Sequence, residues 1–120
     1  MQTIKLIVAG GRDFKNYEVA EQAIEMVRTT YAQQELIILS GMAKGADSCG
    51  WSYAKIHNVP VMEFPAKWDS YGKSAGYRRN TEMAKEADAL LVFWDGVSKG
   101  TKHMIDIMQA LGKQIYTVTY

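Results

Sequence analysis

The stretch ILSGMAKGADSCGWSYA, residues 38–54, runs from an apolar tripeptide through glycines and a lysine into a segment of helical character. A strand, a glycine-bearing turn and a helix in this order form the building unit of α/β proteins. Outward from this unit, five short β-type runs alternate with four longer segments of helical period. The alternation predicts a parallel sheet covered by helices.

The predicted strands are short, and four of them are almost wholly apolar, as strands buried on both faces are. They span Lys5–Ala9, Leu36–Leu39, Val61–Phe64, Ala89–Phe93 and Gln114–Val118. Asn16 and Ser98 stand where helices would begin, and Gly112 stands where a helix would end. We expect one Rossmann-like, doubly wound α/β domain over residues 1–120. Its mainly parallel, five-stranded sheet has the order 3-2-1-4-5 and is flanked by about four helices.

The composition excludes several classes of protein. At 120 residues with 48% hydrophobic content, the chain is long enough for one core. Its net charge of +1 requires no polyanionic partner, and its lone cysteine, Cys49, forms no intramolecular disulfide. The N-terminal MQTIKLIVAGGRDF lacks the features of a signal peptide, and no apolar run approaches the roughly 20 residues that span a bilayer. We expect a cytoplasmic protein with no membrane partner.

Three glycine-bearing loops follow predicted strands: GGRDF at residues 10–14, SGMAKGAD at 40–47 and WDGVSKGT at 94–101. In a doubly wound sheet, ligands bind beyond the carboxyl ends of the strands, where the strand order reverses. Glycines let the backbone approach a ligand, and a helix that follows adds free N–H groups and a positive dipole end. The loops predict a pocket for phosphate or another anion. The alternative is that these loops are only turns between a strand and a helix. Asp47 or Ser48 would then cap the helix after SGMAKGAD, and Ser98 would cap the helix after WDGVSKGT.

The candidate ligand-binding residues stand at these strand ends or at the expected start of the helix before the fourth strand. They are Gly10, Gly11, Arg12, Ser40, Gly41, Lys44, Gly45, Asp47, Arg79, Asn80, Asp95, Gly96, Ser98, Gly100 and Thr101. Arg79 is the strongest candidate for phosphate, because its guanidinium can form two parallel hydrogen bonds. Asp95 is a candidate for ribose hydroxyls and a weak candidate for catalysis. His57, His103 and Cys49 lack the spacing of a metal site, so we predict no bound metal.

The segment PAKWDSYGKSAGYRRN, residues 65–80, breaks the regular alternation of strands and helices. A connection of this length in a compact domain is more often functional than idle. Trp68 and Tyr71 within it can form a lid, stack on a base or seal the core. The sequence leaves these alternatives open.

Four motifs together resemble a known family. VAGGRDF, LSGMAKGAD, FPAKWDSYGKSAGYRRN and ADALLVFWDGVSKGTKHMI are similar to motifs of the YspA-like branch of the SLOG superfamily, in order and over most of the chain. This group also contains the Lonely Guy (LOG) phosphoribohydrolases and the DNA-processing protein DprA. The resemblance implies binding of a nucleotide or nucleotide-derived signal, for sensing or sequestration. The sequence identifies no certain cofactor besides this expected ligand. An exposed helix face in so small a domain is often covered by a second copy, so we also expect a homo-oligomer.

The resemblance to LOG enzymes implies an alternative function, hydrolysis of an N-glycosidic or phosphate bond. Their phosphate loop resembles the segment from Gly96 through Thr101, but the glutamate that closes their motif falls on Met104. A thioether neither stabilises positive charge nor activates water, which disfavours an enzyme. A carboxylate could still come from Asp95, Asp47 or Asp13.

The resemblance to DprA implies a second alternative, binding of single-stranded DNA. SGMAKGAD and RRN are similar to DprA motifs that are associated with its DNA-binding edge. Aromatic side chains can stack on bases, and basic ones can follow the phosphates. The candidates are Arg12, Lys44, Lys67, Lys73, Arg78, Arg79, Lys99 and Lys102, with Trp68, Tyr71 and Tyr77 for stacking.

Overall fold

The structure, a computed structural model, describes residues 2–120. All five predicted strands are present, together with the four predicted long helices and two short helical turns. In chain order the elements are β1 (Thr3–Gly10), α1 (Tyr17–Thr30), β2 (Glu35–Ser40), α2 (Ala46–Ile56), β3 (Val61–Glu63), α3 (Trp68–Tyr71), η1 (Gly72–Ser74), α4 (Ala75–Glu86), β4 (Ala89–Trp94), α5 (Lys99–Ala110) and β5 (Gln114–Thr119).

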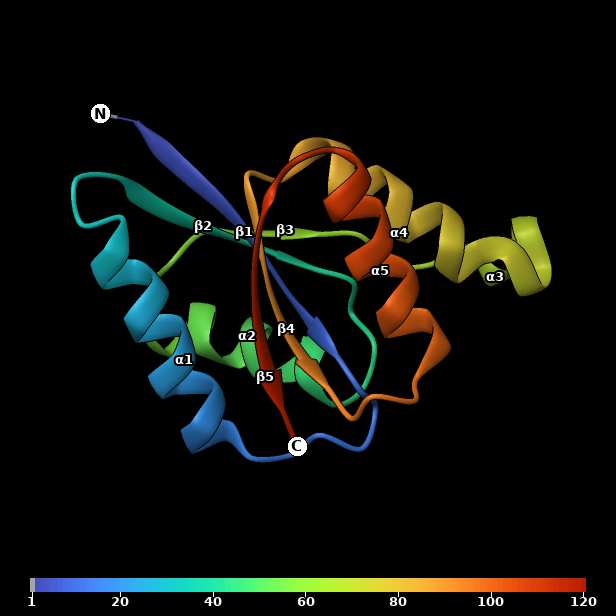
Figure 1. Cartoon of the computed structure of the whole chain (residues 1–120), viewed down its shortest axis with the longest axis horizontal. Helices are drawn as coiled ribbons and strands as arrows, with labels where there is room; N and C mark the ends of the chain where they lie inside the picture. Colours follow the sequence, from blue (N-terminus) through green and yellow to red (C-terminus); the bar gives the residue numbers. More distant parts are fainter. Residues whose placement is uncertain (1) are drawn as a thin grey trace.

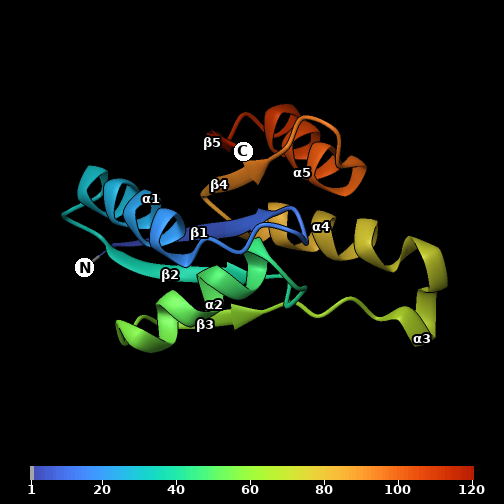
Figure 2. The ribbon, with the colours of Figure 1, turned by 90° about the horizontal axis from the view of Figure 1, so that it is seen from below.

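The sheet has the order β3-β2-β1-β4-β5, and every paired strand is parallel. The predicted order is therefore confirmed, and Figure 2 shows the strands following one another across the sheet. The chain builds outward from β1 on one side through β2 and β3, and then returns to add β4 and β5 on the other side. The strand order thus reverses between β1 and β4.

Helices cover both faces of the sheet. Because successive strand residues point to opposite faces, Leu6 and Val8 of β1 pack with α1 and α2, whereas Ile7 packs with α4 and α5. Figure 1, in which β5 is in front, shows α1 on one side of the sheet and α4 and α5 on the other. The result is a three-layer α/β architecture whose core residues are buried in two clusters.

The connection from β3 to α4 corrects one expectation. We expected a long loop over residues 65–80 with Arg79 opening the next helix, but α4 begins at Ala75 and Arg79 lies in its second turn. Ala75, Met83 and Ala84 are buried apolar residues of α4, and their spacing places them on one face of a helix. This apolar face begins at Ala75, which is why the helix starts there and not at Arg79. The rest of the connection includes α3 and η1, and Figure 2 shows α3 far from the sheet.

The helix starts agree with the sequence in part. The Asn16 side chain caps α1 by accepting a hydrogen bond from the N–H of Val19 at 3.2 Å. Ser98 precedes α5 as expected, but its side chain forms no capping bond to the helix backbone. None of the helices within residues 2–120 is both long and apolar enough to cross a membrane.

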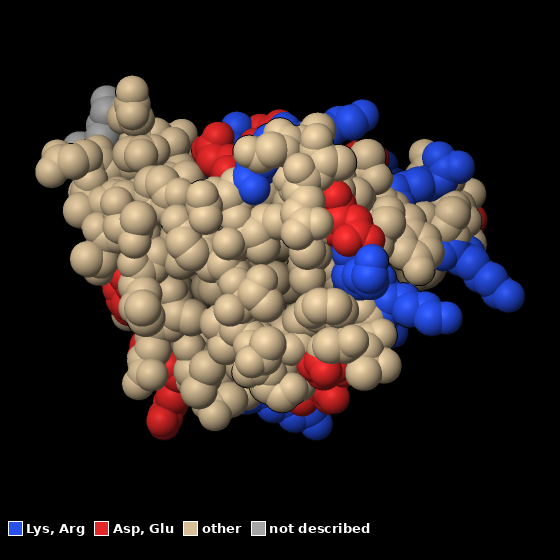
Figure 3. All heavy atoms as spheres, in the orientation of Figure 1, with Lys and Arg blue, Asp and Glu red and all other residues tan. Residues whose placement is uncertain are grey.

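Basic side chains are unevenly distributed over the surface. In Figure 3, Lys and Arg gather at one end of the molecule, over α3, α4 and the start of α5. The exposed basic residues of this region include Arg78 of α4, Lys99 and Lys102 of α5, and Lys73 of η1, which lies between α3 and α4. The net charge of the chain is only +1, but positive charge is concentrated at this end of the molecule.

Candidate functional site

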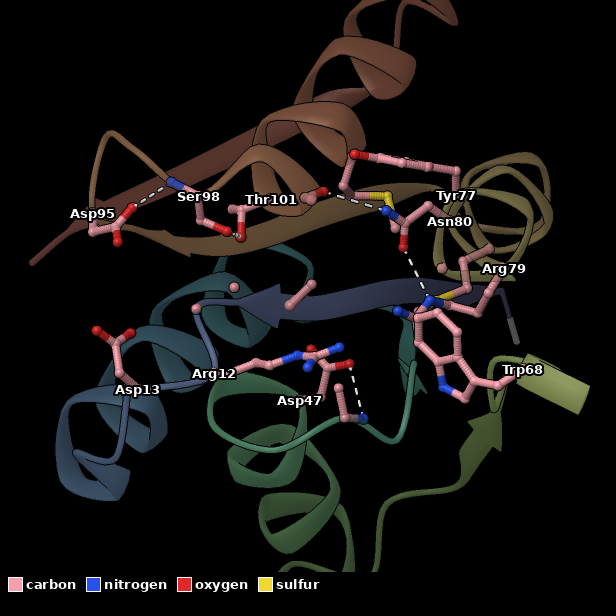
Figure 4. A pocket seen from close by; sticks show the side chains of 18 of the residues that line it. Arg12, Asp13, Asp47, Trp68, Tyr77, Arg79, Asn80, Asp95, Ser98 and Thr101 are labelled. Carbon is pink, nitrogen blue, oxygen red and sulfur yellow. Dashed lines mark hydrogen bonds between the residues drawn. The ribbon is translucent and has the colours of Figure 1, made fainter. Parts of the chain in front are cut away.

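A cleft of about 520 Å³ opens at the carboxyl ends of β1 and β4, where the strand order reverses (Figure 4). Its walls come from the loops after β1, β2 and β4 and from α4 and the start of α5. It is lined by Ala9, Gly10, Gly11, Arg12, Asp13, Ala43, Asp47, Trp68, Lys73, Gly76, Tyr77, Arg79, Asn80, Met83, Asp95, Ser98, Gly100, Thr101 and Met104. This is the edge at which the sequence predicts a ligand.

Glycines let the loops after β1 and β2 interlock. Gly45 has a φ of +84°, and a Cβ placed on it would lie 2.3 Å from the carbonyl oxygen of Gly11. The same Gly11 oxygen accepts a hydrogen bond from the N–H of Ala46 at 3.2 Å. Gly45 is the N-cap of α2, so neither Asp47 nor Ser48 has that role. The turn motif therefore serves loop packing as well as cleft formation.

Arg79 reaches from α4 across the cleft to the end of β2. Its Nη1 donates a hydrogen bond to the carbonyl oxygen of Gly41 at 2.6 Å, and its Nε donates to Oδ1 of Asn80 at 3.0 Å. Burial lowers the pKa of the guanidinium, while the nearby carboxylate of Asp47 raises it and Arg12 lowers it. Within residues 2–120, Arg79 forms no ion pair with a carboxylate. The guanidinium can therefore accept an anionic ligand.

Asn80 connects Arg79 to the first turn of α5. Its side chain is buried, with Oδ1 accepting from Arg79 and Nδ2 donating to the carbonyl oxygen of Gly100 at 3.3 Å. Nδ2 also lies 3.3 Å from Nδ1 of His103. Asn80 thus links α4 and α5 at one wall of the cleft and fixes the orientation of the guanidinium.

Asp47 lies in the first turn of α2 and is only 6% exposed. Its Oδ2 accepts a hydrogen bond from the N–H of Ala43 at 3.3 Å. Burial raises the pKa of this carboxyl from 3.8 to about 6, although Arg79, the Ala43 N–H and Arg12 each act to lower it. The group is ionised at neutral pH, but in an environment that disfavours its charge.

Asp95 organises the turn between β4 and α5. Its Oδ1 accepts hydrogen bonds from the N–H groups of Val97 and Ser98, both at 2.8 Å (Figure 4 shows the bond to Ser98), and these bonds lower the pKa of the carboxyl. Thr101 donates from its Oγ1 to Oγ of Ser98 at 3.1 Å. These contacts order the turn before α5, and they do not replace the side-chain cap that we expected from Ser98.

The structure brings most of the predicted residues together. The cleft is lined by Gly10, Gly11, Arg12, Asp47, Trp68, Arg79, Asn80, Asp95, Ser98, Gly100 and Thr101. Gly41 and Lys44 line an adjoining cleft of about 340 Å³ that shares Arg12, Ala43 and Trp68 with the first. The predicted residues outside both clefts are Ser40, Gly45, Tyr71 and Gly96.

Residues outside the clefts have other contacts. Ser40 is fully buried, and its Oγ accepts a hydrogen bond from the N–H of Met42 at 3.1 Å. The exposed Tyr71 ring lies 4.4 Å from the guanidinium carbon of Arg78.

Trp68 lines both clefts and is 50% exposed, so it does not seal the core.

Several lining residues are absent from the predicted set of ligand-binding residues, although Tyr77 and Lys73 were named for the DNA-binding alternative and Asp13 for the hydrolase alternative. Gly76 and Tyr77 line the cleft beside Arg79 and Asn80, and a Cβ on Gly76 would lie 3.5 Å from the Trp68 ring. The sequence feature that could have identified Gly76 is its spacing of four from Asn80, which places the two residues on one face if the segment is helical. It was missed because the helix was expected to begin later. The others are Ala9, Asp13, Ala43, Lys73, Met83 and Met104.

A parallel sheet with this order and a cleft at its crossover belongs to the Rossmann-like class of α/β proteins. A family model described as the YspA, cpYpsA-related SLOG family matches residues 4–71. The chain is also 32% identical over 116 residues to the Gene 61 protein of Mycobacterium phage D29, with 90% of each chain covered. This protein therefore belongs to the YspA, cpYpsA-related SLOG family.

A solved structure has the same fold. The X-ray structure of DNA processing protein A (DprA) from Streptococcus pneumoniae matches with a TM-score of 0.75 at 17% identity. The match covers 97% of this chain and 50% of the DprA chain, so this chain corresponds to half of DprA. At this identity the likeness is one of fold.

Proposed function

We propose that this protein binds a nucleotide or a nucleotide-derived molecule in the cleft at the β1–β4 crossover, for sensing or sequestration. The observation that carries the proposal is Arg79, which is partly buried at the cleft and forms no ion pair within residues 2–120. Guanidinium groups recognise phosphate through two parallel hydrogen bonds. Membership of the SLOG family supports the same ligand class.

The remaining lining residues suit the other parts of a nucleotide. Arg12 is exposed on the loop after β1 and lines the same cleft, so it supplies a second positive charge. Gly100 and Thr101, in the first turn of α5, line the cleft. The N-terminal turn of a helix favours an anion through its free N–H groups and its dipole. Trp68 and Tyr77 are 50% and 45% exposed and offer flat aromatic surfaces to a base.

We favour binding without hydrolysis because of Met104. Its side chain is 2% exposed and packs in the core cluster between α4, α5 and the sheet. This position offers no carboxylate to stabilise an oxocarbenium-like transition state. Incubation with nucleoside monophosphates, followed by chromatography, is expected to release no base and no phosphate.

Titration calorimetry against a panel of nucleotides tests the binding proposal. We expect at least one nucleotide to bind more tightly than about 1 mM, and Arg79→Ala to weaken it by about 10-fold or more. Arg78→Ala is the matched control, since Arg78 lies outside both clefts and donates to Oγ of Ser74 at 3.1 Å. Equal effects of the two variants, with both folded by circular dichroism, would contradict the proposal.

Native mass spectrometry of freshly purified protein tests ligand and assembly together. A retained small molecule, identified after denaturation, gives the ligand class, and the intact mass gives the number of subunits. We propose a homo-oligomer because large apolar side chains, among them Met26 at 73% and Ile56 at 63%, are exposed on α1 and α2. A spectrum containing only monomer would contradict that part.

Single-stranded DNA is a second candidate ligand. The observation that favours it is the cluster of Lys and Arg over α3, α4 and the start of α5 (Figure 3), which lies beside exposed aromatic residues. It predicts affinity that rises with oligonucleotide length and falls steeply with salt. Equal affinity for a mononucleotide and a long strand, or a flat response to salt, would exclude it.

A further inference from the structure

Three carboxylates line the cleft: Asp13, Asp47 and Asp95. Asp13 and Asp95 are exposed to water, and the protein already uses both. Asp13 accepts a hydrogen bond from the Tyr120 hydroxyl, and Asp95 accepts two from the backbone of its own turn. Asp47 is buried, and within residues 2–120 its carboxylate accepts one hydrogen bond, from the backbone N–H of Ala43 to Oδ2 at 3.3 Å. An ionised carboxylate can accept about four. Water can fill the remaining positions on the exposed Asp13 and Asp95, whereas Asp47 is buried and has less access to water.

The free oxygen of Asp47 faces the cleft. Within residues 2–120 its Oδ1 has no hydrogen-bond donor, and no fully buried side-chain nitrogen or oxygen in that range lacks a partner. Oδ1 is therefore reachable from the cavity that Asp47 lines. Figure 4 shows the side chain next to Arg12, with Oδ2 turned toward the backbone of Ala43. A ligand in the cleft meets an acceptor at this point.

The position of Asp47 relative to Arg79 limits what that ligand can be. A Cβ on Gly41 would lie 2.6 Å from Oδ2 of Asp47 and 2.7 Å from Nη1 of Arg79, so the carboxylate and the guanidinium both lie close to this one glycine. A phosphate oxygen at Arg79 leaves Asp47 close to a second negative charge, which it repels. The Asp47 oxygen instead accepts from a donor that carries no negative charge, and a hydroxyl is such a donor in a molecule that also carries phosphate.

A sugar hydroxyl near a phosphate meets both requirements, and the pair occurs in ribonucleotides. We propose that Asp47 accepts a hydrogen bond from a ribose hydroxyl of the ligand, so that the cleft selects ribonucleotides over their deoxy analogues. This inference rests on the proposed nucleotide-binding function and narrows its ligand class. It assigns the ribose contact to Asp47 rather than to Asp95, whose Oδ1 is occupied by the N–H groups of its turn.

The test is calorimetry with the four ribonucleoside monophosphates, their 2′-deoxy and 3′-deoxy counterparts, and inorganic phosphate. We expect the protein to bind a ribonucleotide about 10-fold or more tightly than one of its deoxy forms. Asp47→Ala removes the acceptor and should bring that ratio close to one. Asp47→Asn keeps the shape and an acceptor oxygen without the charge, and should lower the ratio in part.

Asp106→Asn is the control, because it neutralises an exposed carboxylate that lines neither cleft and should leave the ratio unchanged. A ratio near one in the unmodified protein, or a ratio that survives in both folded Asp47 variants, would overturn the inference while leaving nucleotide binding intact. Absence of binding by either nucleotide series would overturn the proposed function as well.

Discussion

Asp47→Asn is expected to stabilise the protein at neutral pH. In the folded state the carboxyl is 6% exposed, and burial raises its pKa from 3.8 to about 6. The charged groups that act on it are Arg79 from α4 and Arg12 from the loop after β1, and both favour its ionised form without offsetting burial. An asparagine keeps the side-chain oxygen for the Ala43 N–H and has no charge to bury.

The sign and size of the effect follow from this pKa. Between about pH 4 and pH 6, the folded protein holds a proton on Asp47 that the unfolded chain has released, so stability falls as pH rises. The gap between 3.8 and about 6 corresponds to about 3 kcal/mol at 1.36 kcal/mol per pH unit. The stability of Asp47→Asn relative to the unmodified protein should therefore increase by up to about 3 kcal/mol from pH 3.5 to pH 7.

Urea unfolding at a series of pH values measures this difference. At neutral pH the midpoint of Asp47→Asn should exceed that of the unmodified protein by about 1 to 2 M, and the gap should shrink toward pH 4. Asp95→Asn is the control with the opposite sign, because backbone hydrogen bonds lower the pKa of Asp95 and its contribution is lost as pH falls. A gap for Asp47→Asn that does not change with pH would refute the argument.

Four further variants test other parts of the site. Gly45→Ala should destabilise the fold by about 2 kcal/mol or more, since the φ of Gly45 is +84° and the added Cβ would lie 2.3 Å from a carbonyl oxygen. Gly100→Ala adds a Cβ that meets nothing within 4 Å, so it should stabilise α5 by about 0.5 to 1 kcal/mol. Urea unfolding measures both changes. Asn80→Ala should weaken nucleotide binding about 5-fold or more in calorimetry, because Arg79 loses the acceptor at its Nε, and unchanged affinity would contradict that role. Trp68→Ala should weaken binding of nucleotides by about 1 to 3 kcal/mol while leaving inorganic phosphate unaffected, and equal loss for both ligands would argue against stacking.

The order of strands could be predicted because it depends on the alternation of apolar and amphipathic segments, which is visible in the sequence. Apolar runs such as Leu36–Leu39 alternate with amphipathic segments, and the crossover rules of parallel sheets leave few arrangements for five such units. The three glycine loops then had to meet at one edge. This is why Arg12, Asp47 and Thr101, which are 89 residues apart at the extremes, were expected at one site and line one cleft.

The start of α4 could not be predicted in the same way. Gly72 and Gly76 lie close together, and glycines disfavour helices. In the structure only Gly72, with a φ of +55°, breaks the chain direction, whereas Gly76 is helical and lies against Trp68. Tertiary packing of Ala75 and Met83 decides the helix, and single-residue propensity contains no information on such contacts.

The contacts of Arg79 bear on how the cleft can bind a small anion. The guanidinium is held at both ends, by the carbonyl oxygen of Gly41 after β2 and by Asn80, which in turn holds the first turn of α5. A side chain fixed in this way loses little conformational entropy when a ligand binds, so more of the interaction energy appears as affinity. A lysine could not replace it, since the two contacts require separate donors of one planar group. The polar contacts around Arg79 therefore join both halves of the sheet at the cleft and hold the guanidinium in place before the proposed ligand binds.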